Sequence, residues 1–231
     1  MKNNISLNRR ERIRKLWHLL LNLASPALNM YGRLIKTPLY LRLNEKKTRR
    51  MLEIGPGNKR VPGFETVNVV YGREVDYMAD ASKLLPFSDE TFEVVFASHV
   101  LEHTPWFVIE STIKEWTRVL KRGGSLEVWV PDGYKLCKFI ADIEEGTARS
   151  EWHDSWRPFN SENNPIKWAN GRLLYGVRQD YPSWHTSIIT PKLLMNVFEQ
   201  VGLLDVTVMD ESETRGVRHG WINLGVRGRK P

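Results

Sequence analysis

The chain contains, at residues 51–58, the run Met51-Leu52-Glu53-Ile54-Gly55-Pro56-Gly57-Asn58. Its pattern predicts a short apolar strand over residues 51–54, with one carboxylate near the end, followed by a Gly-x-Gly turn. Glycines in such a turn let the backbone approach a ligand closely at the carboxyl edge of an open α/β sheet. We therefore expect a small-molecule site directly after the first strand.

The turn departs from two common nucleotide-binding patterns. A dinucleotide fingerprint needs a third glycine at position 60, where the chain has Arg60, and a short loop through Pro62 and Gly63 replaces the helix that would receive a pyrophosphate. No Gly-x4-Gly-Lys-Ser/Thr string occurs in the sequence either. Neither NAD binding nor a phosphate-cradling loop is expected.

After residue 50, short apolar runs alternate with helix-like segments, a pattern typical of a parallel sheet covered by helices on both faces. The predicted strands cover residues 51–54, 65–70, 92–97, 125–130, 204–209 and 221–226, and the predicted helices cover 106–120, 132–143 and 190–200. Asp132 and Thr190 are the expected caps of the last two helices. Residues 144–183 are polar, tryptophan-rich and irregular. We expect one α/β domain over residues 46–231, with an inserted acceptor-side segment at about 144–189.

Composition and charge separate an N-terminal arm from this domain. The chain has 231 residues and a net charge of +7, yet residues 1–50 hold thirteen basic groups against two acids, which leaves the remainder at −4. Residues 1–45 are predicted to form a basic helical arm that contacts an anionic membrane surface peripherally, although a helix packed on the domain is an alternative. The single cysteine, Cys137, and the lack of a long apolar run favour a soluble, cytoplasmic protein.

Three further motifs follow the first in a fixed order: VDYMADA at 75–81 with LPFSD at 85–89, FEVVFASHVLEH at 92–103, and RVLKRGG at 118–124. Together the four motifs resemble the class I S-adenosylmethionine-dependent methyltransferases, and within them the type 11 group with a shortened loop between the first two strands. The resemblance is strong over about residues 50–131. It continues loosely to Gly202 in a pattern seen in relatives from surface-polysaccharide and lipopolysaccharide pathways.

The resemblance implies a Rossmann-like, doubly wound, mostly parallel seven-stranded sheet with an antiparallel last strand, and S-adenosylmethionine as the cofactor. It implies the following cofactor-binding residues: Glu53, Gly55, Pro56 and Gly57 at the methionine end, Asp80 and Ala81 at the adenine, and Ser98 and His99 facing the sulfonium. This set is chemically coherent, because a cofactor without phosphate needs close backbone approach and carboxylate acceptors.

One position departs from the family pattern. Relatives place an acidic residue at the end of the second strand, where it binds both ribose hydroxyls, and here Val70 is the residue expected at that position. A missing charged acceptor costs about 1.5–3 kcal/mol of binding unless Glu74, Asp76 or water replaces it. Weak cofactor binding, or a non-catalytic scaffold that has kept the fold, is therefore an open alternative.

Residues 99–103 also spell His-x-x-Glu-His, which occurs in some zinc peptidases. In those enzymes the motif lies on one helix, whereas His99 directly follows an apolar strand and no third ligand is evident from the sequence. We therefore expect no metal site, and we expect His103 to be a hydrogen-bonded, partly buried histidine.

Methyl transfer from a sulfonium mainly requires that the acceptor atom be aligned behind the methyl group, and a hydroxyl acceptor also needs a proton acceptor. His185 is the first candidate for this catalytic base and His99 the second. Four aromatic residues of the insert, Trp168, Tyr175, Tyr181 and Trp184, are candidates either for stacking on sugar rings or for ordinary core packing.

We expect O-methylation of a small molecule or a glycan, such as a surface-polysaccharide precursor. The alternative from the same class is a nucleic-acid methyltransferase that uses the basic arm to bind phosphates. The strand that ends at residues 97–99 lacks the Asn/Asp-Pro-Pro-aromatic string of base-amino methylation, and Cys137 lacks the Pro-Cys context of carbon methylation. Nucleic acid is therefore not the expected partner.

Overall fold

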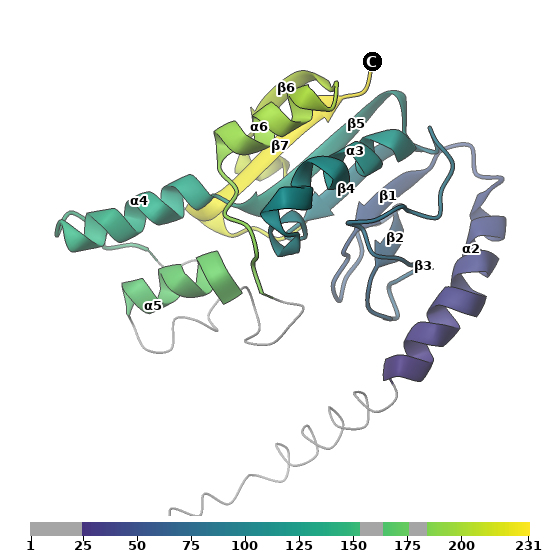
Figure 1. The fold of residues 1–231 in the computed structure, drawn as a ribbon, viewed down its shortest axis with the longest axis horizontal. Helices are drawn as coiled ribbons and strands as arrows, with labels where there is room; N and C mark the ends of the chain where they lie inside the picture. Colours follow the sequence, from purple (N-terminus) through teal and green to yellow (C-terminus); the bar gives the residue numbers. More distant parts are fainter. Residues whose placement is uncertain (1–24, 153–163, 176–183) are drawn as a thin grey trace, which may run out of the picture.

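The computed structural model describes residues 25–152, 164–175 and 184–231. Its centre is a seven-stranded sheet with the strand order β3-β2-β1-β4-β5-β7-β6 (Figure 1). The strands are β1 (Met51–Ile54), β2 (Glu65–Asn68), β3 (Tyr77–Met78), β4 (Phe92–Ser98), β5 (Leu120–Pro131), β6 (Leu204–Met209) and β7 (Asn223–Arg229). β1 pairs in parallel with β2 and β4, and β7 pairs antiparallel with β5 and β6. The predicted Rossmann-like sheet, with its antiparallel last strand, is confirmed.

The sheet places a ligand edge between β1 and β4. Strand order runs outward from β1 toward β3 on one side and from β4 toward β6 on the other. In open α/β sheets, small molecules bind outside the carboxyl ends of the strands at this point of reversal. The ends of β1 at Ile54 and of β4 at Ser98 therefore define where the site lies.

The second strand is shorter than the apolar run 65–70 predicts. β2 ends at Asn68, whose side-chain Oδ1 accepts a hydrogen bond of 2.8 Å from the backbone N–H of Val69. This local bond competes with continued strand pairing, as asparagine side chains commonly do. Val70 consequently lies in a bend and is 43% exposed.

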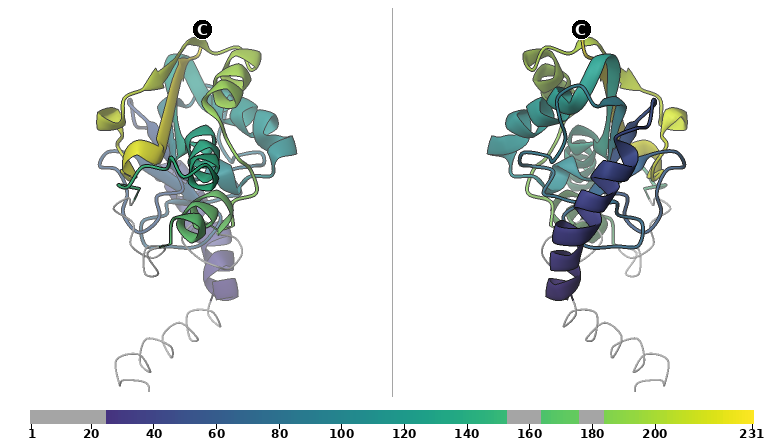
Figure 2. Two further views of the ribbon diagram at one scale, coloured as in Figure 1. Left: turned by 90° about the vertical axis from the view of Figure 1, so that its left-hand side faces the viewer. Right: turned by 90° about the vertical axis from the view of Figure 1, so that its right-hand side faces the viewer.

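Helices α3 (Ile109–Val119) and α6 (Pro191–Gln200) contact each other, and Figure 2 shows them on the same side of the sheet. α3 starts three residues later than predicted, because residues Trp106–Val108 form a 3₁₀ turn after Pro105. The two predicted caps are confirmed: the side chain of Asp132 accepts from Lys135 N at the start of α4 (Gly133–Glu144), and that of Thr190 accepts from Leu193 N.

The two faces of the sheet are covered differently, which corrects the expectation of helices on both. Ile113 and Trp116 of α3 and Phe198 of α6 belong to the main core on one face. On the other face, Phe64, Phe96, Trp129 and Met209 form a smaller cluster whose packing partners come from strands and loops. The connection between β1 and β2 is only residues 55–64, too short for a crossover that contains a helix.

The described part of the arm packs beside β3. Residues 25–31 are helical, η1 (Gly32–Lys36) is a π-helical turn, and α2 (Thr37–Asn44) continues the rod along that end of the sheet (Figure 1). Thr37 Oγ1 donates to Gly32 O and accepts from Met78 N, both at 2.8 Å, and Asn44 Nδ2 donates to Tyr77 OH at 2.7 Å. Among the described residues, no helix is long and apolar enough to cross a membrane.

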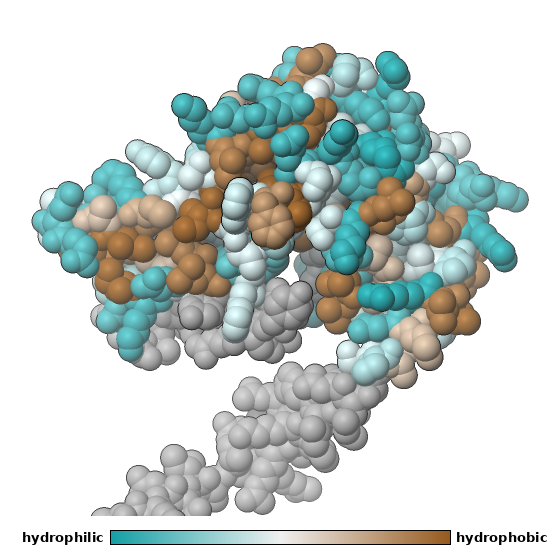
Figure 3. Space-filling model, in the orientation of Figure 1, coloured by the Kyte–Doolittle hydropathy of each residue, from teal (hydrophilic) through white to brown (hydrophobic). Residues whose placement is uncertain are grey.

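The segment after α4 contains regular structure that the sequence reasoning did not predict. α5 (Pro165–Asn170) and η5 (Gly171–Tyr175) pack against α4, and Asn164 caps α5 by accepting from Lys167 N. Trp168 is fully buried in a second small core with Phe139 and Trp152. Figure 3 shows apolar residues gathered at this end of the molecule, on the left. Trp168 is therefore a core residue and cannot stack on a sugar ring.

Candidate functional site

The predicted glycine turn lies at the carboxyl end of β1. Gly55 and Gly57 have φ values of +70° and +59°, which glycine adopts without strain. A Cβ atom at Gly55 would lie 2.4 Å from Cγ2 of Val100, whereas a Cβ at Gly57 would meet nothing within 4 Å. Gly55 therefore allows Val100 to pack on the turn, while Gly57 leaves the backbone open to a ligand. Pro56 O accepts from Lys59 N and closes the turn.

Glu53 stabilises the loop that follows this turn through a hydrogen bond to the backbone. Its Oε2 accepts a hydrogen bond of 2.7 Å from Val61 N, and the residue is buried. Burial raises the pKa of Glu53, and the Val61 bond and the charge of Arg60 offset part of that rise. Arg60, which takes the place of a third glycine, is itself paired with Glu74 and Asp76. The Glu53 carboxylate thus holds the loop after the glycine turn in place.

The residue at the end of the second strand is Asn68 and not Val70. Asn68 is the last residue of β2 and lies next to the carboxyl end of β1, whereas Val70 comes two residues after the strand ends. The two proposed substitutes are already engaged, because both Glu74 and Asp76 bind Arg60. The sequence reasoning missed Asn68 because it extended the second strand by two residues; the asparagine, which favours turns, was the available signal.

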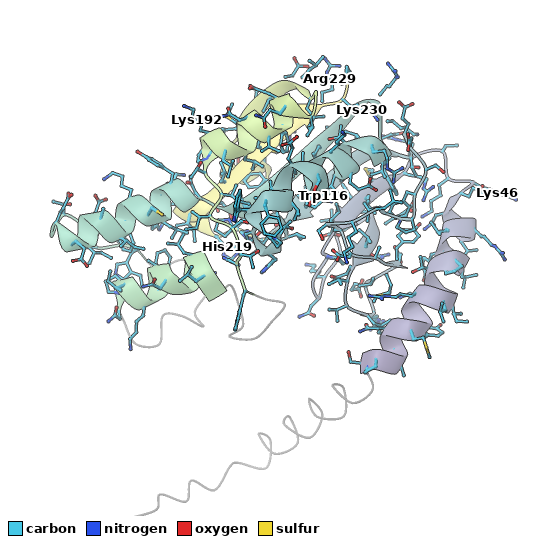
Figure 4. The ribbon with its side chains drawn as sticks, viewed as in Figure 1. Lys46, Trp116, Lys192, His219, Arg229 and Lys230 are labelled. Carbon is cyan, nitrogen blue, oxygen red and sulfur yellow. The ribbon has the colours of Figure 1, made fainter. Side chains whose placement is uncertain are left out.

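Asp80 and Ala81 lie just after β3, at the same edge. Asp80 Oδ1 accepts from Ser82 N at 3.0 Å and from Ser82 Oγ at 2.7 Å. Partial burial works to raise the pKa of Asp80, but the hydrogen bonds from Ser82 and the charge of Lys83 outweigh it and lower that pKa. Trp116 Nε1 of α3 donates to Ala81 O at 2.9 Å, and Figure 4 shows Trp116 on that helix. The Asp80 carboxylate is thus ionised, and the bond from Trp116 holds the turn at Ala81 against α3.

Ser98 and His99 point in different directions. The Ser98 side chain lies on the face that Phe96 occupies, where a Cβ on Gly216 would come within 2.5 Å of Ser98 Oγ. That hydroxyl is buried and has no hydrogen-bond partner among the described residues. The expectation that Ser98 faces the sulfonium is therefore not supported by its direction. His99 has φ +56° and turns toward the sheet edge.

The hydrogen bonds of His99 define its protonation. Its Nδ1 lies 3.2 Å from Glu102 Oε1, and its Nε2 lies 3.1 Å from Asn223 Oδ1. Asn223 Nδ2 donates to Val217 O, so the amide oxygen is the atom that faces His99. Because a carboxylate and an amide oxygen can only accept, both ring nitrogens donate. Both ring nitrogens of His99 are thus engaged as donors in this arrangement, and neither is open to accept a proton from a substrate.

Glu102 is the central charged residue that sequence reasoning did not single out. It is 2% exposed, and its Oε2 has no hydrogen-bond partner among the described residues. Burial works to raise the pKa of Glu102, but the hydrogen bond and charge of His99, with the nearby His103 and His185, outweigh it and lower that pKa to about 2. The carboxylate is therefore ionised at neutral pH.

His103 and His185 meet across Glu102, although 81 intervening residues separate them in the chain. Their ring centroids are 5.0 Å apart. His103 Nδ1 lies 3.1 Å from Trp184 O, and His185 Nδ1 lies 2.8 Å from Arg172 O. Both Nδ1 atoms must donate to these carbonyls, so each ring in its neutral form has its lone pair on Nε2. Burial lowers the pKa of His185, which favours its neutral form.

A fourth histidine and one aromatic side chain complete the surroundings. His219 stacks edge-on against His99 with ring centroids 4.3 Å apart, and Figure 4 shows it between the sheet and the α4–α5 end of the molecule. Trp184, next to His185 in the chain, is 44% exposed and is therefore not an ordinary core residue. The side chains of Tyr175 and Tyr181 lie outside the described residues.

Comparison with known proteins yields one family match and a set of similar solved structures. A family model described as a methyltransferase domain matches residues 52–128. No curated protein matches the sequence. Similar solved structures include S-adenosylmethionine-dependent methyltransferases from Archaeoglobus fulgidus (14% identity, 84% of this chain and 94% of that chain, TM-score 0.48) and Thermotoga maritima (19%, 96% and 98%, TM-score 0.46). A third is a 1,6-didemethyltoxoflavin N1-methyltransferase from Burkholderia thailandensis (13%, 98% and 92%, TM-score 0.47).

The residues at this edge fit S-adenosylmethionine. Gly57 leaves an open backbone approach, and Asn68 and the ionised Asp80 supply oxygen acceptors for hydroxyl and amino groups. The cofactor has no phosphate, so it needs no arginine, and the pairing of Arg60 with Glu74 and Asp76 does not weaken the site. With the motif order, the sheet topology and the matched segment, the chain carries in residues 52–128 an S-adenosylmethionine-dependent methyltransferase domain of type 11.

Proposed function

We propose that this protein transfers the methyl group of S-adenosylmethionine to a hydroxyl oxygen of a small molecule or a glycan, of the kind that serves as a surface-polysaccharide precursor. The observation that carries this proposal is the neutral His185, whose Nε2 lone pair lies with that of His103 near the carboxyl edge of β4. A hydroxyl acceptor needs such a proton acceptor, whereas a neutral amine attacks through its own lone pair.

When bound, the cofactor supplies a methyl group on a positively charged sulfur. The S–CH₃ bond breaks as the O–CH₃ bond forms, and the hydroxyl proton passes to Nε2 of His185. A base with a lowered pKa is unprotonated at neutral pH and can accept that proton. The surrounding residues act mainly by aligning the acceptor oxygen behind the methyl group.

The hydrogen bonds of His99 and His185 favour different roles for these two candidate bases. His99 donates from both ring nitrogens, so we assign it an electrostatic role in holding Glu102 ionised. His185 keeps its lone pair and is the proposed base. The non-catalytic scaffold was motivated by Val70, and that motive weakens because Asn68, a hydrogen-bonding residue, occupies the strand end.

A sugar-containing acceptor is favoured by the exposed Trp184 beside His185, since an aromatic face packs well on the apolar face of a pyranose. The looser resemblance of the C-terminal part to relatives from polysaccharide pathways supports the same class of acceptor. The methyltransferase domain itself is compatible with other acceptor atoms, so the hydroxyl assignment rests on the histidines.

We also propose peripheral attachment of the cytoplasmic protein to an anionic membrane through the arm. The helical segment from residue 25 to residue 44 exposes a row of large apolar side chains: Met30, Tyr31, Leu34, Ile35, Leu39 and Leu43. Basic side chains, including Arg33, Lys36 and Arg42, lie in the same segment. Exposed apolar residues flanked by basic ones are typical of helices that lie in a membrane interface.

The proposed base is tested by His185→Gln. Methyl transfer from radiolabelled S-adenosylmethionine to a panel of hydroxyl-bearing glycans should fall by about 10²–10⁴-fold in kcat, the usual contribution of a general base. Cofactor affinity, measured by calorimetry, should stay within about threefold, because His185 is assigned to the acceptor side. Full turnover by the variant on the acceptor used by the wild type would contradict the assignment.

A further inference from the structure

We propose that Glu102, His103 and His185 form a binding site for a divalent first-row transition-metal cation such as Zn²⁺. One ligand atom from each residue lies within 4.8 Å of the other two. Two imidazole nitrogens and one carboxylate oxygen are a ligand set that such cations prefer, with further coordination positions left open. Glu102 and His103 are adjacent in the sequence, whereas His185 is distant, and only the fold brings it to them.

The hydrogen bonds prepare both histidines as ligands. In known metal sites, a histidine that binds through one ring nitrogen donates its other N–H to a carbonyl or carboxylate. His103 and His185 each donate Nδ1–H to a backbone carbonyl, those of Trp184 and Arg172. Each ring is thereby fixed in the tautomer that presents its Nε2 lone pair to Glu102.

The carboxylate of Glu102 lacks the partner that a cation would supply. Oε1 accepts from His99 Nδ1 and lies 4.0 Å from His185 Nε2, whereas Oε2 is buried and has no hydrogen-bond partner among the described residues. An ionised oxygen in this position is costly unless a donor or a cation pairs with it. His99 thus orients one oxygen and leaves the other for the ion.

Backbone contacts hold the two halves of the site together. Thr186 N and Ser187 N both donate to Glu102 O, at 2.8 and 3.2 Å, and Ser187 Oγ donates to Thr104 O. His185 N donates to Leu174 O at 3.0 Å. The ligand atoms, which lie within 4.8 Å of one another, need to approach by at most about 1.5 Å to reach the roughly 3.3 Å separation found around a tetrahedral ion with metal–nitrogen distances near 2.0 Å.

The charge balance suggests what completes the coordination. The cluster supplies one carboxylate and two imidazoles, so its ligands offset only one of the two charges of a divalent cation, and coordination positions stay open. An oxygen of the methyl acceptor can fill an open position, and coordination lowers the pKa of a hydroxyl. This role deepens the proposed O-methylation and rests on it: with the ion bound, coordination replaces His185 in activating the hydroxyl, whose proton leaves to solvent. Binding of the ion does not depend on that role.

The test is a titration of the full-length, chelator-treated protein with Co²⁺, followed by visible absorption, and with Zn²⁺, followed by calorimetry. We expect one equivalent to bind, and at least tenfold weaker binding by Glu102→Gln and by His103→Ala. Glu110→Gln removes an exposed carboxylate of α3 outside the cluster and is the matched control for Glu102→Gln, with unchanged affinity expected.

Two outcomes would overturn the site: no stoichiometric binding by the wild type, or equal affinities for His103→Ala and the wild type. The hydrogen bond of His103 is exposed and that of His185 is part-buried, so the His103 variant keeps the test decisive if His185→Ala fails to fold, which circular dichroism will show. Titration with S-adenosylmethionine, run separately without metal, distinguishes failure of the cofactor site from failure of the metal site.

Discussion

At the scale of single residues, the most consequential finding is the position of the residue that ends β2. Asn68, with its amide oxygen, is at the strand end, and Val70 is two residues beyond it in a bend. A carboxylate binds paired hydroxyls more strongly than an amide does, because charge-assisted hydrogen bonds are about twice as strong as neutral ones. This difference gives a direct way to test the ribose position.

We predict that Asn68→Asp tightens S-adenosylmethionine binding by about tenfold, equivalent to roughly 1.4 kcal/mol. The aspartate can still accept from Val69 N, so the end of the strand should be preserved. Val70→Asp is the matched control and should change the affinity by less than about twofold. Calorimetric titration of both variants measures the effect, and a gain confined to Val70→Asp would place the ribose elsewhere.

Glu53 gives a pH-dependent prediction. Burial raises the pKa of its carboxyl group above the ordinary value of 4.5, so the folded protein keeps that proton to higher pH than the unfolded chain does. The stabilising contribution of Glu53 is fully present below pH 4.5 and is lost as the pH rises through its folded-state pKa.

The comparison variant is Glu53→Gln, which cannot titrate and can still accept the Val61 hydrogen bond. Urea unfolding without cofactor, from pH 4 to pH 7, should show the free energy of unfolding of the wild type falling relative to that of the variant as the pH rises. A difference that stays constant or grows with pH is the result that would disprove the shift.

At the scale of elements, helix α3 links the core to the adenine-side turn. Trp116 is fully buried and donates from Nε1 to Ala81 O at 2.9 Å. Its position on the buried face of the helix was predictable from the spacing of Ile109, Ile113, Trp116 and Leu120. The bond to Ala81 was not, because it joins residues 35 apart through tertiary packing.

We predict that Trp116→Phe lowers the free energy of unfolding by about 2 kcal/mol, through the lost hydrogen bond and the smaller ring. It should also weaken S-adenosylmethionine binding, since the turn at Ala81 loses its anchor. Trp106→Phe, at a position that is largely exposed, is the control and should change neither quantity measurably. Chemical denaturation and calorimetry provide the two measurements, and unchanged cofactor affinity in Trp116→Phe would remove the link.

At the scale of the whole molecule, the arm has two parts with different expected roles. Residues 25–44 pack beside β3 through Thr37 and Asn44, so this part stabilises the fold. Residues 1–24 hold six basic groups against one acid, and we propose that they add electrostatic attraction to the membrane contact made by the exposed apolar side chains of residues 25–44. Near an anionic surface, each basic residue contributes about 1 kcal/mol.

Two truncations separate these roles. Removal of residues 1–24 should leave Tm within about 2 °C and reduce co-sedimentation with phosphatidylserine vesicles by more than tenfold. Removal of residues 1–44 should also lower Tm by about 8 °C or more, since roughly 2–4 °C accompanies each kcal/mol in a chain of this size. Vesicles of phosphatidylcholine alone are the control. Undiminished sedimentation of both truncated proteins would refute the membrane contact of the arm.

The sequence by itself determined six of the strands (β1, β2, β4, β5, β6 and β7), the helices α3, α4 and α6, the Gly-x-Gly turn and the two helix caps. These features depend on local periodicity and on side chains that bond neighbouring backbone groups. Strand ends were less determined: one asparagine bond ends β2 two residues early. Only the tertiary structure brought His103 and His185 together around Glu102 and buried Trp168 in a second core. Such contacts join residues far apart in the chain, and their pairing follows from packing between elements, which no local pattern encodes.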